Sequence, residues 1–138
     1  MVRNWVYSNF TSRDGINAMD IRLKRAYDQP ARSDGPRILV DRIWPRGVAK
    51  DDADLNHWLK GLAPSSELRK WFGHDPDKWS EFRKRYLEEL KKEDAAEDLQ
   101  QLRAILETHG RITLVFAAKD TVHNNAVALR AYILDGEL

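Results

Sequence analysis

The sequence predicts an α/β fold: a small Rossmann-like domain in three layers, with a short, mostly parallel sheet flanked by helices. Two short apolar runs, at residues 38–40 and 112–117, are typical of strands that are buried on both faces. Helical patterns fill the sequence between them, and strands that alternate with helices form parallel sheets. The length of 138 residues is that of one domain, which buries about two-thirds of the surface of its unfolded chain.

The chain divides into an N-terminal extension, residues 1–18, and a single α/β domain, residues 19–138. In the extension, the aromatic stretch at residues 5–10 either adds an edge strand to the sheet or packs over the core. Translation starts either at Met1 or at Met19, which directly precedes the first strand pattern.

That first strand pattern has a period of two, as expected of a strand with one solvent-exposed face. Its side chains alternate between apolar and basic: Ile21, Arg22, Leu23 and Lys24. Residues 30–36, rich in Pro, Ser and Gly, predict a turn or loop before the buried strand at 38–40.

Several helices are expected after that strand. Apolar residues spaced by three and four predict a helix over residues 55–62, which Pro64 closes. The next helix is short: either Ser65 or Ser66 caps its start, and Gly73 ends it.

Two longer helices precede the last strand. Asp75 followed by Pro76 is a typical helix start, and the apolar stripe behind it predicts a helix over residues 79–90. A second stripe at residues 99–106 predicts another helix, which Gly110 ends.

Composition excludes several functional classes. With no cysteine, the chain has no disulfide framework, thiolate metal site or cysteine nucleophile, and a cytoplasmic location is expected. The four histidines lack paired ligand spacing, so no metal site is expected. No apolar run approaches the roughly 20 residues of a bilayer helix, so no membrane association is expected. A formal net charge of +1 argues against general nucleic-acid binding.

Ligands of open α/β sheets bind beyond the carboxyl ends of the strands, and polar residues gather at those predicted ends. The loop after the strand at 38–40 carries Asp41, Arg42, Trp44, Arg46 and Gly47. The segment after the last strand carries Lys119, Asp120, His123, Asn124 and Asn125. If the two strands are parallel neighbours, both loops face one crevice.

The first loop is suited to a small anionic ligand, such as a nucleotide or a phosphorylated metabolite. Arg42 and Arg46 offer planar forks to a phosphate or carboxylate. Lys119, in the loop on the other side of the expected crevice, is a further ligand-binding candidate. Trp44 walls the pocket, and Gly47 lets the backbone approach the ligand. The alternative is structural: Arg42 pairs with Asp41 or Asp120, Trp44 belongs to the core, and Pro45 with Gly47 forms only a turn.

If the protein is an enzyme, His123 is the candidate acid/base, because an imidazole exchanges protons near pH 7. Either Asp41 or Asp120 would orient a base. Asn124 and Asn125 would position the substrate by amide hydrogen bonds, or alternatively serve the local bonding for which asparagine is favoured near helix starts.

The final helix covers about residues 123–134, and either Asp120 or Thr121 caps it. His74 is a further ligand-binding candidate from the string WFGHD at residues 71–75, where a glycine and a capping aspartate hold it toward the crevice. The alternative is a solvated histidine after a helix stop.

Three strings carry a family resemblance: RILVDRIWPRGV at 37–48, HWLKGLAPSSELRKWFGHDPDKWSEFRKRY at 57–86 and ITLVFAAKDTVHNNAVAL at 112–129. Together they resemble the YeaO-like branch of the family called domain of unknown function 488, over roughly residues 19–134. The resemblance implies a small bacterial or archaeal Rossmann-like domain and no established activity. Other branches carry cysteines near Phe116 and Asn124 that this chain lacks, so it implies no thiol chemistry here.

Two other functions compete with ligand binding. In a non-catalytic regulatory or interaction module, exposed tryptophans would line a partner surface, the candidates being Trp5, Trp58, Trp71 and Trp79. Sequence-specific nucleic-acid binding is the least favoured function, because the N-terminal surplus of basic residues is modest. The sequence predicts no particular cofactor and no oligomeric state.

Overall fold

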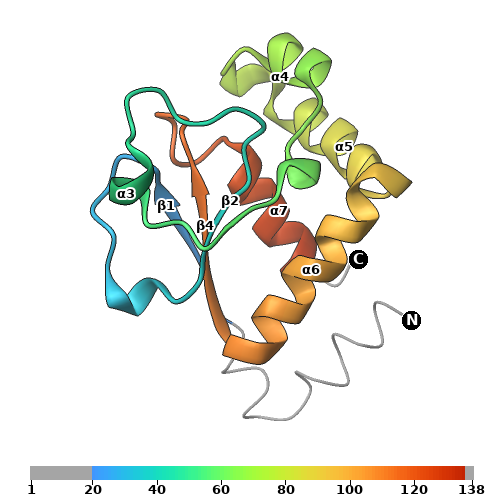
Figure 1. The fold of residues 1–138 in the computed structure, drawn as a ribbon. Coiled ribbons are helices and arrows are strands. Elements are labelled where there is room, and N and C mark those ends of the chain that lie inside the picture. The colour runs from blue at the N-terminus through green and yellow to red at the C-terminus, as the bar shows by residue number, and fades with distance from the viewer. Residues whose placement is uncertain (1–19, 136–138) are drawn as a thin grey trace.

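The computed structural model describes residues 20–135, so the predicted extension at residues 1–18 lies outside the described part. One sheet organises the fold (Figure 1). Its strands are β1 (Asp20–Arg25), β2 (Arg37–Leu39), β3 (His57–Trp58) and β4 (Arg111–Phe116). All pairs are parallel, in the order β1-β4-β2-β3. The predicted α/β class and parallel sheet are therefore confirmed.

Helices cover one face of this sheet and enclose the main core (Figure 1). They are α4 (Ser66–Phe72), α5 (Trp79–Leu90), α6 (Glu93–His109) and α7 (Asn125–Leu134). Ile38, Ile112, Leu114 and Phe116 belong to this core on the strand side. None of the helices in residues 20–135 is long and apolar enough to cross a membrane.

A thinner layer covers the opposite face. There Leu39 and Val115 form a small apolar cluster with Trp44 and Trp58. The short helix α3 (Lys50–Ala53) lies on this side, away from the other four helices (Figure 1). The sheet thus lies between two layers of unequal thickness, which confirms the expected three-layer arrangement.

Burial along the strands follows their places in the sheet. β4 is central, and five of its six residues are buried, because helices and loops cover both of its faces. β1 is an edge strand with one buried residue, Ile21. This difference explains why β4 has a continuous apolar run, whereas apolar and basic residues alternate in β1.

The prediction of a helix over residues 55–62 is wrong. The segment forms β3, which pairs with β2, and then the 3-10 turn η2 (Lys60–Leu62). Leu59 and Leu62 are both buried, so the spacing of three that indicated a helix comes from the 3-10 turn. The two-residue strand is too short to show a period of two.

Helix ends match the expected caps in most places. Ser65, rather than Ser66, caps α4, and its side chain accepts a hydrogen bond from the Leu68 amide at 3.1 Å. Gly73 ends α4 in the left-handed conformation, and Gly110 does the same for α6. Asp75 caps a 3-10 turn, η3 (Pro76–Lys78), that leads directly into α5.

The cap of the final helix differs from both alternatives. α7 begins at Asn125, and Asn124 caps it by accepting a hydrogen bond from the Val127 amide at 3.0 Å. Asp120 instead accepts hydrogen bonds from the amides of Val122 and His123 in the turn before the helix. It therefore closes that turn, and the helix starts two residues later than predicted.

Candidate functional site

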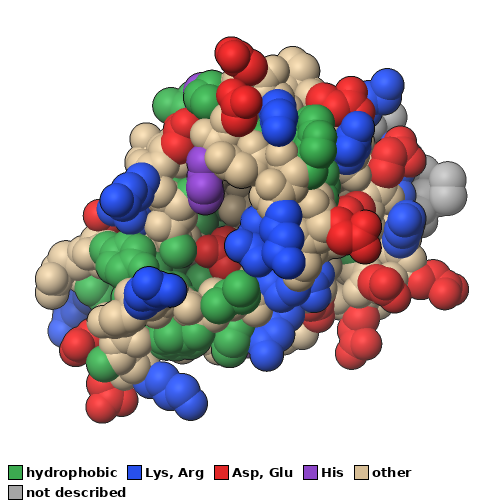
Figure 2. Space-filling model, turned by 90° about the horizontal axis from the view of Figure 1, so that it is seen from above, with side chains coloured by type: hydrophobic (Ala, Val, Ile, Leu, Met, Phe, Trp, Pro, Cys, Tyr) green, Lys and Arg blue, Asp and Glu red, His purple; other side chains and the backbone are tan. Residues whose placement is uncertain are grey.

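A cleft of about 760 Å³ lies at the carboxyl edge of the sheet. The loops after β2 and β4 both line it, because β2 and β4 are parallel neighbours and end at the same edge. The expectation that these two loops share one crevice is confirmed. Seen from above, Figure 2 shows this face hollowed, with Lys and Arg side chains around a hollow that contains acidic atoms.

Ten of the eleven predicted site residues line this cleft: Asp41, Arg42, Trp44, Arg46, His74, Lys119, Asp120, His123, Asn124 and Asn125. Gly47 does not line it. Its φ of 80° explains the glycine, because this backbone conformation strains residues with a Cβ. A Cβ added to Gly47 would meet no protein atom within 4 Å, so close packing within the described chain does not account for the glycine, and its approach to a ligand stays a prediction.

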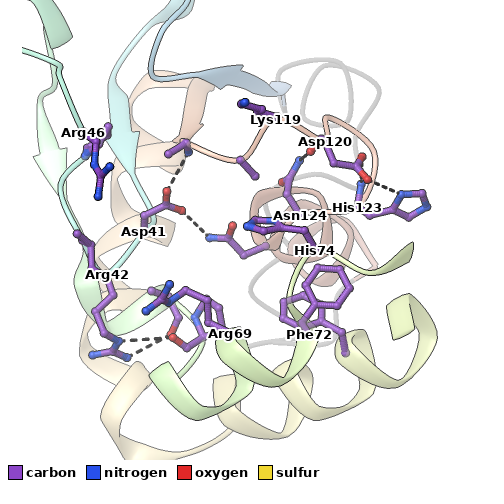
Figure 3. A pocket seen from close by; sticks show the side chains of 18 of the residues that line it. Asp41, Arg42, Arg46, Arg69, Phe72, His74, Lys119, Asp120, His123 and Asn124 are labelled. Atoms are coloured by element: carbon purple, nitrogen blue, oxygen red, sulfur yellow. Dashed lines mark hydrogen bonds and ion pairs between the residues drawn. The ribbon is translucent and has the colours of Figure 1, made fainter. Parts of the chain in front are cut away.

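Asp41 lies at the centre of the cleft, directly after β2 (Figure 3). One carboxylate oxygen accepts a hydrogen bond from the Ala117 amide at 2.9 Å, and the other accepts one from Asn125 Nδ2 at 3.1 Å. Burial raises the pKa of the Asp41 carboxyl, and these bonds with the nearby charges of Arg69 and His74 offset only part of the rise. The site therefore has a carboxyl that ionises less readily than a surface aspartate.

Asp120 and His123 form a second polar group. His123 Nδ1 lies 3.0 Å from one Asp120 oxygen, and the other oxygen accepts the backbone amides of Val122 and His123. These two backbone bonds, followed by the contact with the His123 ring, lower the pKa of Asp120 to about 2. The imidazole also packs edge-on against Trp79, with ring centres 5.3 Å apart.

The two asparagines differ in role. Asn124 is 3% exposed, and its amide is used within the fold: the oxygen caps α7 and Nδ2 donates to the Asp120 backbone oxygen at 2.9 Å. Asn125 Nδ2 donates to Asp41 and, at 3.0 Å, to the backbone oxygen of Val40. Both side chains therefore build the cleft wall, and contact with a ligand stays a prediction for each.

Cationic side chains surround the Asp41 carboxylate (Figure 3). Arg42 contacts the backbone oxygens of Ala63 and Pro64 at 3.4 and 3.5 Å, and not the carboxylates with which pairing was the alternative. Among residues 20–135, Arg42, Arg46 and Lys119 form no ion pair with a carboxylate. Their charges are free to act on a bound group.

Aromatic and aliphatic side chains form the apolar wall. Trp44 packs against the small core cluster and also lines the cleft, and contact with a ligand stays a prediction. Its indole nitrogen donates to the Val48 backbone oxygen at 2.7 Å, which fixes the ring. Ile43 beside it is 59% exposed, and Phe72 lines the wall supplied by α4.

His74 follows that wall in an unusual backbone conformation. It is one of two residues other than glycine with positive φ in the described chain, at 59°. Such conformations are strained and concentrate at functional sites. His74 lines the cleft and its charge acts on Asp41, so the turn after α4 brings it where the WFGHD string indicated.

Sequence reasoning missed two lining residues with polar side chains, Arg69 and Tyr27. Arg69 is an exposed residue of α4 with no ion pair inside residues 20–135. Its position three residues before the buried Phe72 is a usable signal, because residues spaced by three share a helix face. Tyr27 donates from its hydroxyl to the Arg46 backbone oxygen at 3.0 Å, which only the folded loop reveals.

The tryptophans proposed for a partner surface are partly covered. Trp58, Trp71 and Trp79 are all half-buried, whereas Trp5 lies outside the described residues. Trp58 donates to the Asp41 backbone oxygen at 2.7 Å, and Trp71 lies beneath the charged ends of Lys78 and Arg85. These rings serve the fold, which weakens the interaction hypothesis.

No group of three or more His, Asp or Glu side chains in residues 20–135 is placed to hold a metal ion. Fold and site together define a small α/β domain with a cation-lined cleft at the carboxyl edge of a parallel sheet.

The comparisons with known proteins place this domain in a family. Residues 20–137 match the family model described as the inactive DUF488-N3 subclade, and the chain belongs to the DUF488 family as a YeaO-like member. The uncharacterised protein YeaO of Escherichia coli K12 is 41% identical over 115 residues, which cover 83% of this chain and 97% of YeaO. The uncharacterised protein Rv3073c of Mycobacterium tuberculosis H37Rv is 40% identical over 116 residues, covering 84% and 94% of the two chains. No solved structure matches the chain.

Proposed function

We propose that the protein binds a small anionic ligand, a nucleotide or a phosphorylated metabolite, in the cleft at the carboxyl edge of the sheet. The surplus of cationic side chains in the cleft carries this proposal. Two lining residues are carboxylates, Asp41 and Asp120, and four are cationic: Arg42, Arg46, Arg69 and Lys119. Arginine and lysine side chains without ion pairs are the groups with which proteins bind phosphates.

The size and lining of the cleft support an organic ligand over an inorganic ion. Its volume of about 760 Å³ falls within the roughly 300–1,000 Å³ of small-molecule pockets. Ile43 and Trp44 from the loop after β2, and Phe72 from α4, are apolar lining side chains on which a ring can lie.

Binding without turnover is the form of the proposal that the family description supports, because the matching subclade is described as inactive. Acid–base catalysis by His123 is the second candidate, favoured by its contact with Asp120. However, the ring lies on the far side of Asp120 from Asp41 and packs on Trp79 (Figure 3). A protein-interaction module is the remaining alternative function.

We further propose that the protein is cytoplasmic, because the sequence has no cysteine.

The test is a thermal-shift and calorimetric titration with inorganic phosphate, ribose 5-phosphate and AMP, on the wild type and on Arg69→Ala. A probe at 100 times its dissociation constant should stabilise the wild type by about 2.7 kcal/mol. Loss of one charge-assisted hydrogen bond is worth about 1.5–3 kcal/mol, so Arg69→Ala should weaken binding by roughly 10- to 150-fold.

Arg32→Ala is the matched control, because Arg32 is an exposed arginine in η1 (Arg32–Asp34), before β2 and so at the other edge of the sheet. It removes the same charge and should bind like the wild type. The proposal fails if no phosphorylated probe binds, or if the two variants weaken binding equally. For the catalytic alternative, His123→Ala should retain binding, and a turnover that it abolishes would replace binding alone with catalysis.

A further inference from the structure

The two carboxylates that line the cleft differ in their free acceptor capacity. Asp120 already accepts two backbone amides on one oxygen and contacts the His123 ring with the other. Each oxygen of Asp41 accepts one hydrogen bond, although an ionised carboxylate offers about four acceptor sites. Asp41 can therefore accept further hydrogen bonds from a bound molecule.

A simple anion does not match this centre. A phosphate placed against Asp41 would meet a carboxylate at low dielectric, where like charges repel strongly. The cationic groups lie around Asp41 rather than on it (Figure 3). A fitting ligand therefore has two different parts: an anionic group for the arginines and lysine, and a hydrogen-bond donor for Asp41.

The donor on the ligand should be neutral. An ammonium group would suit Asp41 alone, but the cleft carries four lysine or arginine side chains against two carboxylates. The surplus positive charge would oppose a second cation. Hydroxyl groups donate hydrogen bonds without adding charge, and in dinucleotide-binding α/β folds an acidic residue accepts a hydrogen bond from a ribose hydroxyl.

We propose that the ligand of this cleft is a phosphate ester of a hydroxylated sugar, with its phosphate on Arg42 and Arg69 and a sugar hydroxyl donating to Asp41. This inference rests on the proposed function. A sugar phosphate and a nucleotide share this chemistry. They differ in whether a base also lies on an apolar side chain of the cleft, either Ile43 or Trp44 from the loop after β2 or Phe72 from α4.

The experiment compares ligands that differ by one or two hydroxyls. Calorimetric titrations of the wild type use ribose 5-phosphate against 2-deoxyribose 5-phosphate, and AMP against 2′-deoxy-AMP and 2′,3′-dideoxy-AMP. We expect at least a tenfold loss of affinity when the hydroxyl that reaches Asp41 is removed. This comparison needs no variant, so it holds even if substitution at Asp41 unfolds the protein.

Asp41→Asn then assigns the effect to the carboxylate. We expect the preference for hydroxylated over deoxy ligands to fall to about one-fold, while inorganic phosphate binds as tightly as before or more tightly. Asp77→Asn, at an exposed position in η3, is the control and should change neither the preference for hydroxylated ligands nor the affinity for inorganic phosphate.

The outcomes separate this inference from the function on which it rests. Deoxy and hydroxylated ligands that bind equally, and still depend on Arg69, would overturn the inference and retain anion binding. Absence of binding by every probe would overturn both. Tighter binding of AMP than of ribose 5-phosphate would support a nucleotide, and equal binding would support a sugar phosphate.

Discussion

The Asn125 side chain joins the start of α7 to Asp41 at the end of β2. Its Nδ2 donates to the Asp41 carboxylate at 3.1 Å and to the Val40 backbone oxygen at 3.0 Å. One amide thus holds a helix start, a strand end and the central carboxylate of the cleft in a single arrangement.

Asn125→Ala should therefore destabilise the fold and shift Asp41. Buried acceptors left without a donor cost about 1–3 kcal/mol, so the free energy of unfolding should fall by that amount in urea denaturation at pH 7. The pKa of Asp41, already raised by burial, should rise further in a carboxyl NMR titration. Gln101→Ala, at an exposed amide of α6, is the control. An unchanged Asp41 titration would contradict this account.

Asp34 ties the first two strands together at the opposite edge of the sheet. Its carboxylate lies 2.7 Å from the guanidinium of Arg37, which is 2% exposed, and 3.2 Å from Lys24 Nζ. Asp34→Asn should lower the free energy of unfolding by about 3–5 kcal/mol, because it leaves Arg37 as an uncompensated buried charge. Asp20→Asn, which breaks exposed pairs with Arg22 and Arg111, should cost no more than about 1 kcal/mol.

The ion pair between Asp34 and Arg37 should also make the free energy of unfolding depend on pH. Burial raises the pKa of Asp34, but hydrogen bonds from Ala31, Lys24 and Arg37 outweigh it, so the pKa lies below its ordinary value. Its contribution is then fully present above about pH 4 and is lost as pH falls through the folded-state pKa. In denaturation experiments from pH 6 to pH 2, the difference in free energy of unfolding between the wild type and Asp34→Asn should shrink. A constant difference would contradict the prediction.

Replacing Gly35 and Gly47 by alanine separates two costs of a Cβ: backbone strain at positive φ and lack of space. Both have positive φ, at 65° and 80°. A Cβ at Gly35 would lie 2.8 Å from the Arg111 backbone oxygen, whereas one at Gly47 would meet nothing within 4 Å. Gly47→Ala should cost about 1–2 kcal/mol, and Gly35→Ala clearly more, because the backbone must also move. Equal losses in thermal denaturation would show that the close approach is unimportant.

Ser65 and Ser66 form a matched pair at the start of α4. The Ser65 hydroxyl accepts from the Leu68 amide and donates to Glu89 at 2.6 Å. Ser65→Ala should cost about 0.5–2 kcal/mol, whereas Ser66→Ala, at an exposed position inside the helix, should change stability little. Because α4 carries Arg69, Ser65→Ala should also weaken binding of AMP, if AMP binds. A larger loss of stability in Ser66→Ala than in Ser65→Ala would contradict the assignment of Ser65 as the cap.

Asp120 should titrate near pH 2, held there mainly by the backbone amides of His123 and Val122 and then by the His123 ring. His123→Ala keeps both amides, so the pKa of Asp120 should rise only part of the way to 3.8 in a carboxyl NMR titration. Since the folded-state pKa is lowered, the contribution of Asp120 to stability is present above about pH 4 and lost as pH falls through about 2. A complete return to 3.8 would assign the shift to the ring alone.

Local sequence predicted those elements whose burial is uniform along their length. The central strand β4 has a continuous apolar run because both of its faces are covered. The prediction of a helix at 55–62 was wrong because the structure of this segment depends on a distant strand. β3 exists only by pairing with β2, and the Leu59 amide donates to the Leu39 backbone oxygen at 3.0 Å. A pattern within one segment cannot indicate a partner strand elsewhere in the chain.

For the site, the sequence by itself determined which loops carry polar groups and, through the parallel sheet, that they meet at one edge. Only the tertiary structure decided how each group is used: Asn124 as a cap, Gly47 outside the cleft, and Arg69 brought in from α4. The physical reason is that strand direction follows from short-range patterns, whereas hydrogen-bond partners and burial depend on side chains distant in the sequence. Burial of Asp41 beneath the start of α7 is such a long-range result, and it gives the cleft its central acceptor.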